Sequence, residues 1–209
     1  MDEAIIDLKN LCFRWKKSGS ILLDISEFRL IQNDHVFLQG PSGCGKSTLL
    51  SLVGGILISE SGSLKVLGQE ICNLSQSARD AFRVDHIGFI FQLFNLLPYL
   101  SIEENVMLPL RFSSIRAKRA GRTKLDRLNE AKRLLKALGL EEQQAKKSPV
   151  IELSVGQQQR VAAARAVIGS PELIIADEPT SSLDKDLRNS FLELLFGECK
   201  KSGSTLLFV

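Results

Sequence analysis

The sequence predicts an α/β protein with a mostly parallel, doubly wound sheet. The first observation is a pair of short, fully apolar runs at residues 87–91 and 173–176, which are typical of strands buried on both faces. The second is that helical patterns alternate with such runs along the chain, as a doubly wound sheet requires. With 209 residues, the chain is long enough for one large domain with a sizeable core.

Short apolar runs at residues 5–8 and 21–23, separated by a turn-like stretch at 17–20, predict β-strands in the N-terminal part. A short strand at 36–38 leads into a glycine-rich loop, and a helix is expected to begin at about Gly45. A further strand is predicted at 64–67, followed by a helix from Ser75, which is a suitable N-cap.

The pattern from residue 101 to 140 is helical and predicts a subdomain inserted into the sheet domain over residues 93–155. We expect one long basic helix at 114–138, ending at Gly139. Ser154 should cap a helix over 155–168, and another helix is expected at 184–201. The final apolar run, 205–209, predicts a strand that leaves an apolar, unfinished edge.

Residues 40–48, which read GPSGCGKST, fit the phosphate-loop pattern G-x-x-x-x-G-K-[ST]. Glycines let backbone N–H groups surround a polyphosphate, and the following helix adds the positive end of its dipole. Lys46 can reach the β- and γ-phosphates, and the Ser47 hydroxyl can bind Mg²⁺. Since a strand precedes the loop and a helix follows it, we predict a nucleotide site formed by Gly40, Pro41, Ser42, Gly43, Cys44, Gly45, Lys46, Ser47 and Thr48.

Composition indicates a soluble, cytosolic protein. No apolar run approaches the roughly 18 residues of a membrane span, and the N-terminus lacks the pattern of a signal peptide. The four cysteines have no metal-ligand spacing and fit a reducing compartment. Cys44 lies inside the phosphate loop, so we expect ATP to protect it from alkylation.

Charge is unevenly distributed along the chain. The net charge is +3, but residues 116–147 contain eleven basic and four acidic side chains. A solvated helix face is the interpretation that the composition favours. The alternative is a surface that meets anionic lipid headgroups or nucleic acid.

Two adjacent carboxylates, Asp177 and Glu178, follow the buried strand at 173–176. Gln92 ends the other buried strand, and ligands gather at such carboxyl ends of parallel strands. Trp15 is the only tryptophan, and it precedes a loop. A structural role is the usual explanation for such a residue, and stacking on adenine is the alternative.

Four further segments resemble the ATP-binding proteins of ABC transporters. Residues 153–157 (LSVGQ) resemble the signature motif, usually LSGGQ, and 173–179 (LIIADEP) resemble the Walker B strand with its catalytic glutamate. Residues 181–184 resemble the D-loop, and Gln92 occupies the Q-loop position. The sequences of residues 88–92, 95–98 and 104–110 are similar to those of the ATPases of lipoprotein-releasing and macrolide-export transporters, the LolD and MacB group. The resemblance covers essentially the whole chain.

The resemblance implies an ABC ATPase with a mostly parallel core sheet, an N-terminal antiparallel β subdomain and a helical subdomain at 93–155. It implies ATP and Mg²⁺ as cofactors, with Glu178 as general base, Gln92 sensing the γ-phosphate, and Ser47, Gln92 and Asp177 around the metal. It places Trp15 on adenine. The remaining implied contacts to ATP come from the signature and D-loop residues Ser154, Gly156, Gln157 and Asp184.

The implied active unit is a head-to-tail dimer, of two copies or of paralogues, with two ATP molecules between the protomers. A separate membrane permease is the implied partner, which would hold the chain on the cytoplasmic face of the inner or plasma membrane. The implied cargo is an envelope substrate such as a lipoprotein, peptide or drug.

Two departures from the family pattern stand out. Val155 replaces the first signature glycine, so we expect weakened or redirected phosphate contact. The family's switch histidine is absent, and His35 and His86 lie in contexts that suggest structural roles. We therefore expect a C-terminally incomplete chain that binds ATP and hydrolyses it slowly.

Two other functions remain open at this point. One is a soluble ABC ATPase acting on DNA or ribosomes, which only the basic segment 116–147 supports, so nucleic acid is not a favoured partner. The other is an ATP-dependent clamp that dimerises with little turnover, which Val155 and the missing histidine would suit. Glu178 argues against a pure clamp, since a clamp needs no general base.

Overall fold

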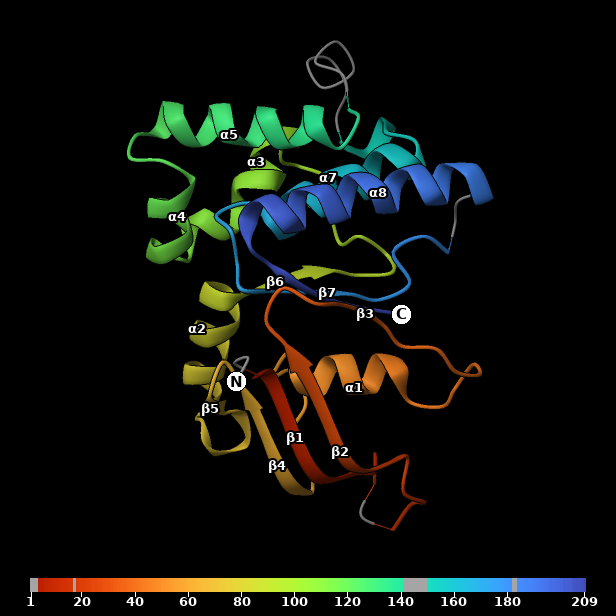
Figure 1. Cartoon of the computed structure of the whole chain (residues 1–209). Helices are drawn as coiled ribbons and strands as arrows, with labels where there is room; N and C mark the ends of the chain where they lie inside the picture. The colour runs from red at the N-terminus through yellow and green to blue at the C-terminus, as the bar shows by residue number, and fades with distance from the viewer. Residues whose placement is uncertain (1–3, 17, 141–149, 182–183) are drawn as a thin grey trace.

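A computed structural model describes residues 4–16, 18–140, 150–181 and 184–209. The chain forms two sheets with helices above, between and beside them (Figure 1). The first sheet is antiparallel and has the order β2-β1-β4-β5, from β1 (Ala4–Phe13), β2 (Leu23–Ile31), β4 (Ser61–Val66) and β5 (Gln69–Glu70). The antiparallel N-terminal subdomain is therefore confirmed, although Ile21 and Leu22 precede β2 instead of forming a strand.

The second sheet is parallel and has the order β3-β8-β7-β6, from β3 (His35–Phe37), β6 (Ile87–Ile90), β7 (Leu173–Ala176) and β8 (Thr205–Phe208). The prediction that the last strand leaves an apolar edge is wrong. β8 lies inside this sheet and pairs with β3 on one side and β7 on the other. Sequence order gave no sign of this, because a parallel sheet places strands by their crossovers instead of by their succession.

The two faces of the parallel sheet pack into different cores. Leu173 and Ile175 of β7 join a core with β1 and helix α1 (Lys46–Val53), whereas Ile174 and Ala176 point the other way. The second core contains helices α7 (Val155–Val167) and α8 (Lys185–Ser202). This alternation explains why β7 is apolar at every position: it is buried on both sides.

Short helices connect the two layers. Helix η1 (Ile71–Asn73) and helix α2 (Gln76–His86), which Ser75 caps as predicted, lead into β6. Beyond β6 lie α3 (Ile102–Met107), η2 (Leu108–Arg111), α4 (Ser114–Ala120), α5 (Lys124–Ala137) and η3 (Val150–Glu152). Their apolar side chains share the core of α7 and α8, which runs across the predicted subdomain boundary. The division at residues 93–155 stays a prediction.

The single long helix predicted at 114–138 is wrong. Gly121 ends α4 with φ 150°. Thr123 starts α5 with a capping box: its Oγ1 accepts from the Asp126 N–H, and Asp126 Oδ2 accepts from the Thr123 N–H. The glycine and the cap outweigh the continuous helical pattern. Gly139 follows α5 with φ 78°, as expected for the residue after a helix. Part of the basic segment 116–147 lies outside the described residues.

Candidate functional site: a phosphate loop joined to two strand ends

The phosphate loop connects β3 to α1 in the predicted strand–loop–helix order. Gly45 is the N-cap of α1 and has φ 98°, a left-handed conformation that favours glycine. A Cβ at this position would lie 2.6 Å from Leu23 Cδ2, so the antiparallel sheet also requires glycine here. The first N–H groups of α1 have no side-chain cap and remain available to an anion.

Lys46 folds back over the loop. Its Nζ donates to the carbonyl oxygens of Gly40 at 3.0 Å and Pro41 at 2.9 Å, and lies 3.9 Å from Cys44 Sγ. An ammonium group has three donors and can exchange such neutral acceptors for phosphate oxygens, which bind it more strongly. The loop thus keeps its cation at the position where a polyphosphate would lie.

One contact joins the phosphate loop to the carboxyl end of β7, and two more join the carboxyl ends of β6 and β7 to each other. Ser47 Oγ donates to Asp177 Oδ1 at 2.9 Å, and the Asp177 N–H donates to Ile90 O at 2.9 Å. Gln92 Nε2 donates to Glu178 Oε2 at 3.0 Å. The structure therefore brings both predicted carboxylates, the serine and the glutamine to one edge of the sheet, as expected for parallel strands.

Glu178 has φ 47°, a left-handed conformation that costs of order 1–3 kcal/mol for a residue with a side chain. Ser181 supports this turn, since its N–H and its Oγ both donate to Glu178 O at 3.2 Å. Strain of this kind persists only where surrounding contacts fix it, and it is concentrated at functional sites.

A pocket of about 320 Å³ lies over the loop. Trp15 forms one wall; it is 65% exposed and meets Phe13 edge to face at a ring-centroid distance of 5.3 Å. A large exposed ring beside a phosphate loop fits the adenine-stacking interpretation better than a structural one. The other lining residues are Leu22, Ser42, Gly43, Gly45, Lys46, Ser47, Thr48 and Glu178.

The pocket is lined by seven of the fourteen predicted ATP-binding residues. Gly40, Pro41 and Cys44 of the loop do not line it, nor do the signature residues and Asp184. Ser154 caps α7 through a capping box: its Oγ accepts from the Gln157 N–H at 3.3 Å, and Gln157 Oε1 accepts from the Ser154 N–H at 2.9 Å. Gly156 lies in the first turn, and Val155 is 50% exposed. Asp184 caps α8, while Ser182 and Leu183 of the expected D-loop lie outside the described residues.

The histidines lie away from the pocket lining, in agreement with structural roles. His35 stacks on Phe196 at 5.3 Å, and His86 Nδ1 lies 3.1 Å from Glu172 Oε2. Glu172 also accepts from Arg119 at 2.7 Å. Burial by itself raises the pKa of Glu172, but the hydrogen bonds from His86 and Arg119 outweigh it and hold the pKa at about 2. This carboxylate directly precedes β7, the strand that delivers Asp177 and Glu178.

Sequence reasoning missed two residues near the site. Leu22 lines the pocket close to Gly45, although the sequence pattern predicts it as part of a strand. Arg165 of α7 contacts the turn that follows Gln92. This contact could not be predicted from the sequence, because the acceptors are backbone carbonyls, which every residue carries.

The family model for ABC transporters matches residues 23–181, which include the phosphate loop, Gln92, the signature and Asp177–Glu178. This chain belongs to the ABC transporter family. It is the ATP-binding subunit of an ABC transporter, and it is an ATPase. The narrower resemblance to LolD and MacB stays a prediction.

Individual relatives agree with the family. The ABC transporter ATP-binding protein YbbA of Escherichia coli K12 is 40% identical over 190 residues, which cover 91% of this chain and 79% of YbbA. The dimeric post-hydrolysis structure of the cassette MJ0796 with ADP and Pi matches with a TM-score of 0.85 at 35% identity, covering 98% of this chain and 87% of that one. CbiO1 of Clostridium perfringens, part of the transporter complex cbiONQ, matches with a TM-score of 0.81 at 26% identity, covering 100% and 78%.

Among the described residues of this ABC subunit, no helix is long and apolar enough to cross a membrane.

Proposed function

We propose that this ABC subunit works as a head-to-tail dimer that hydrolyses ATP to drive a separate membrane permease. The observation that carries the proposal is the separation of the two ATP-contacting parts. The phosphate loop and Glu178 line one pocket, whereas Ser154 and Gly156 lie outside it at the solvent-accessible start of α7. A second copy would supply its signature helix to the open side of the pocket. The dimeric structure of MJ0796 supports this arrangement.

Within each pocket, Lys46 and the loop N–H groups would hold the phosphates, and Trp15 would stack on the base. Glu178 would accept the proton of the attacking water, with Gln92 fixing the carboxylate that does so. Ser154 of the second copy would contact the γ-phosphate, and the exposed Val155 would weaken that contact relative to the glycine usual in the family.

Mg²⁺ fits the donor set present. Ser47 Oγ and Asp177 Oδ1 lie 2.9 Å apart, and both are hard oxygen donors of the kind that Mg²⁺ prefers. Ser47 and Asp177 would hold the ion, with Gln92 nearby. When bound, Mg²⁺ would neutralise charge on the phosphates of ATP.

The permease would place the chain on the cytoplasmic face of the membrane. The complex that contains CbiO1 supports a transporter assembly as the setting. We propose a cargo from the cell envelope, such as a lipoprotein, peptide or drug. The support is the sequence resemblance of residues 88–92, 95–98 and 104–110 to the LolD and MacB group.

Two experiments test the proposal. Light scattering after gel filtration of Glu178→Gln should show a monomer without nucleotide and a doubled mass with ATP, because bound ATP then persists at the interface. Lys46→Ala is the control and should remain monomeric.

The second experiment is capture of the tagged protein from gently solubilised membranes, which should yield a permease. Recovery of ribosomes or DNA would favour the nucleic-acid alternative, and a second copy alone with negligible turnover would favour the clamp.

A further inference from the structure

Arg165 holds the turn that directly follows Gln92. It lies near the end of α7 and is only 8% exposed. Its Nη1 donates to Asn95 O at 2.7 Å, and its Nη2 donates to Phe94 O. One guanidinium group therefore binds two consecutive carbonyls, a geometry that its planar fork suits and that a lysine cannot reproduce.

The turn depends on such support. Phe94 and Asn95 have φ 58° and 49°, so two successive residues with side chains adopt the left-handed conformation. This conformation is unfavourable for residues that carry a Cβ. Leu93, between Gln92 and this pair, is 83% exposed and contributes little packing. The turn has its own backbone hydrogen bonds, from the Phe94 N–H to Phe91 O at 2.9 Å and from the Asn95 N–H to Leu93 O at 2.6 Å, and Arg165 adds two more from its side chain.

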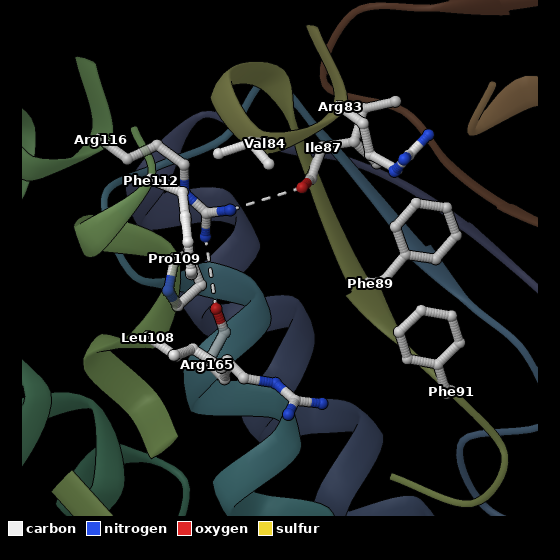
Figure 2. A pocket seen from close by; sticks show the side chains of 10 residues that line it. All are labelled: Arg83, Val84, Ile87, Phe89, Phe91, Leu108, Pro109, Phe112, Arg116 and Arg165. Atoms are coloured by element: carbon white, nitrogen blue, oxygen red, sulfur yellow. Dashed lines mark hydrogen bonds between the residues drawn. The ribbon is translucent and has the colours of Figure 1, made fainter. Parts of the chain in front are cut away.

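One side of this region borders a groove. The groove has a volume of about 240 Å³. Figure 2 shows its apolar lining, which includes Phe89, Phe91, Pro109 and Phe112, with Arg165 extending from α7 beside them. Phe91 is the residue before Gln92, so the segment that carries Gln92 lacks close packing on that side. On the other side Phe94 is buried in the core, so this packing and Arg165 together hold the turn.

We propose that Arg165 is a positioning residue for ATP hydrolysis: it fixes the backbone after Gln92 so that the Gln92 amide stays on Glu178. Ser154 and Arg165 lie at opposite ends of α7, so this helix connects the signature to the turn after Gln92. This inference rests on the proposed roles of Gln92 and Glu178. Arg165 itself touches neither reacting group.

Arg116 shows what a merely structural arginine looks like in the same groove. Its guanidinium donates to the carbonyl oxygens of Ile168, Ala166, Arg165 and Ile87 at 2.6–3.4 Å, and so ties the end of α7 to the start of β6. Figure 2 draws the bonds to Ile87 and Arg165. Burial lowers the pKa of Arg116 and of Arg165 to about 10, so both stay cationic at neutral pH. Only Arg165 reaches the turn beside Gln92.

The test compares ATP turnover and ATP affinity in Arg165→Ala and Arg165→Lys, each with Gln92 intact and with Gln92→Ala. Affinity is read from the fluorescence of Trp15, the only tryptophan, which lines the pocket. Arg165→Ala should lower kcat about tenfold while the Kd for ATP changes by less than about twofold, because a misplaced group affects chemistry more than binding. Arg165→Lys should fall between Arg165→Ala and the unchanged protein.

In the Gln92→Ala background, Arg165→Ala should change kcat by less than about twofold, because the Gln92 amide that Arg165 positions is already absent. Arg160→Ala is the matched control: Arg160 lies on the same helix and donates to Leu138 O at 2.5 Å, away from Gln92. It should keep kcat within about twofold.

An equal loss in both backgrounds, a parallel loss of ATP affinity, or no loss in Arg165→Ala would overturn the inference. If Arg165→Ala does not fold, the same comparison with Arg165→Lys decides. If the unchanged protein shows no hydrolysis that depends on Glu178, the proposed function fails instead.

Discussion

The phosphate loop and the Gln92–Glu178 pair are two halves of one site, and they are built differently. The loop is one stretch of residues whose glycine conformation and lysine contacts are made within the stretch itself. Gln92 and Glu178 are 86 residues apart and meet at 3.0 Å only because β6 and β7 are neighbours in the sheet. The half that binds is therefore local, and the half expected to catalyse depends on tertiary packing.

The largest effect should come from Glu178→Gln, which breaks the tertiary half and leaves the local half intact. Loss of a general base lowers turnover by about 10²–10⁴-fold. The Kd for ATP should stay within about threefold, because the loop contacts are unchanged. Turnover and Trp15 fluorescence measure the two quantities separately. A parallel loss of both would mean that the halves are not separable.

Cys44 reports on the local half alone. It is exposed, Cys12 and Cys72 are half-buried, and burial raises the pKa of Cys199 to about 12. ATP should slow alkylation of Cys44 by N-ethylmaleimide about tenfold, because the nucleotide covers the loop and the thiolate is the reactive form. Glu178→Gln should show the same protection, and Cys44→Ala measures background labelling. Equal rates with and without ATP would exclude nucleotide from this loop.

Trp15 shows whether ATP binding also depends on a residue outside the phosphate loop. It follows β1 of the antiparallel sheet, yet it lines the pocket over the loop. Trp15→Ala should weaken ATP binding about five- to tenfold, because stacking of an aromatic ring on a base contributes about 1–3 kcal/mol. Trp15→Tyr should keep most of the affinity. Calorimetric titration measures both variants. Unchanged affinity for ATP in Trp15→Ala would contradict stacking on the base and would favour a structural role for Trp15.

The smallest effect concerns Glu172, at the far end of β7 from the catalytic pair. Its pKa is lowered from 4.5 to about 2 in the folded protein, so its contribution to stability is present above pH 4.5 and is lost as pH falls towards 2. Glu172→Gln should reduce the free energy of unfolding at neutral pH by less than about 1 kcal/mol, given its partial exposure. The difference should shrink below pH 4.5 in denaturant titrations. Asp80→Asn, which alters the exposed pair with Arg83, is the control.

Several elements could be predicted because their causes are local. Ser75, Ser154 and Gly139 mark helix ends through contacts within a few residues, and the uniformly apolar strand at 173–176 reports its own burial. The break at Gly121 was equally local, but the continuous helical pattern on both sides of it led us to overlook the cap at Thr123.

By itself, the sequence determined the phosphate-loop motif and most of the order of strands and helices, and it suggested the residues that we propose bind ATP and activate water. Each of these follows from side chains or backbone conformations within one short segment. Only the tertiary structure decided that β8 lies inside the sheet, that Ser47 meets Asp177, and that Arg165 holds the turn after Gln92. These contacts join residues far apart in the chain. In the case of Arg165 the acceptors are backbone carbonyls, which every residue carries and no sequence pattern distinguishes.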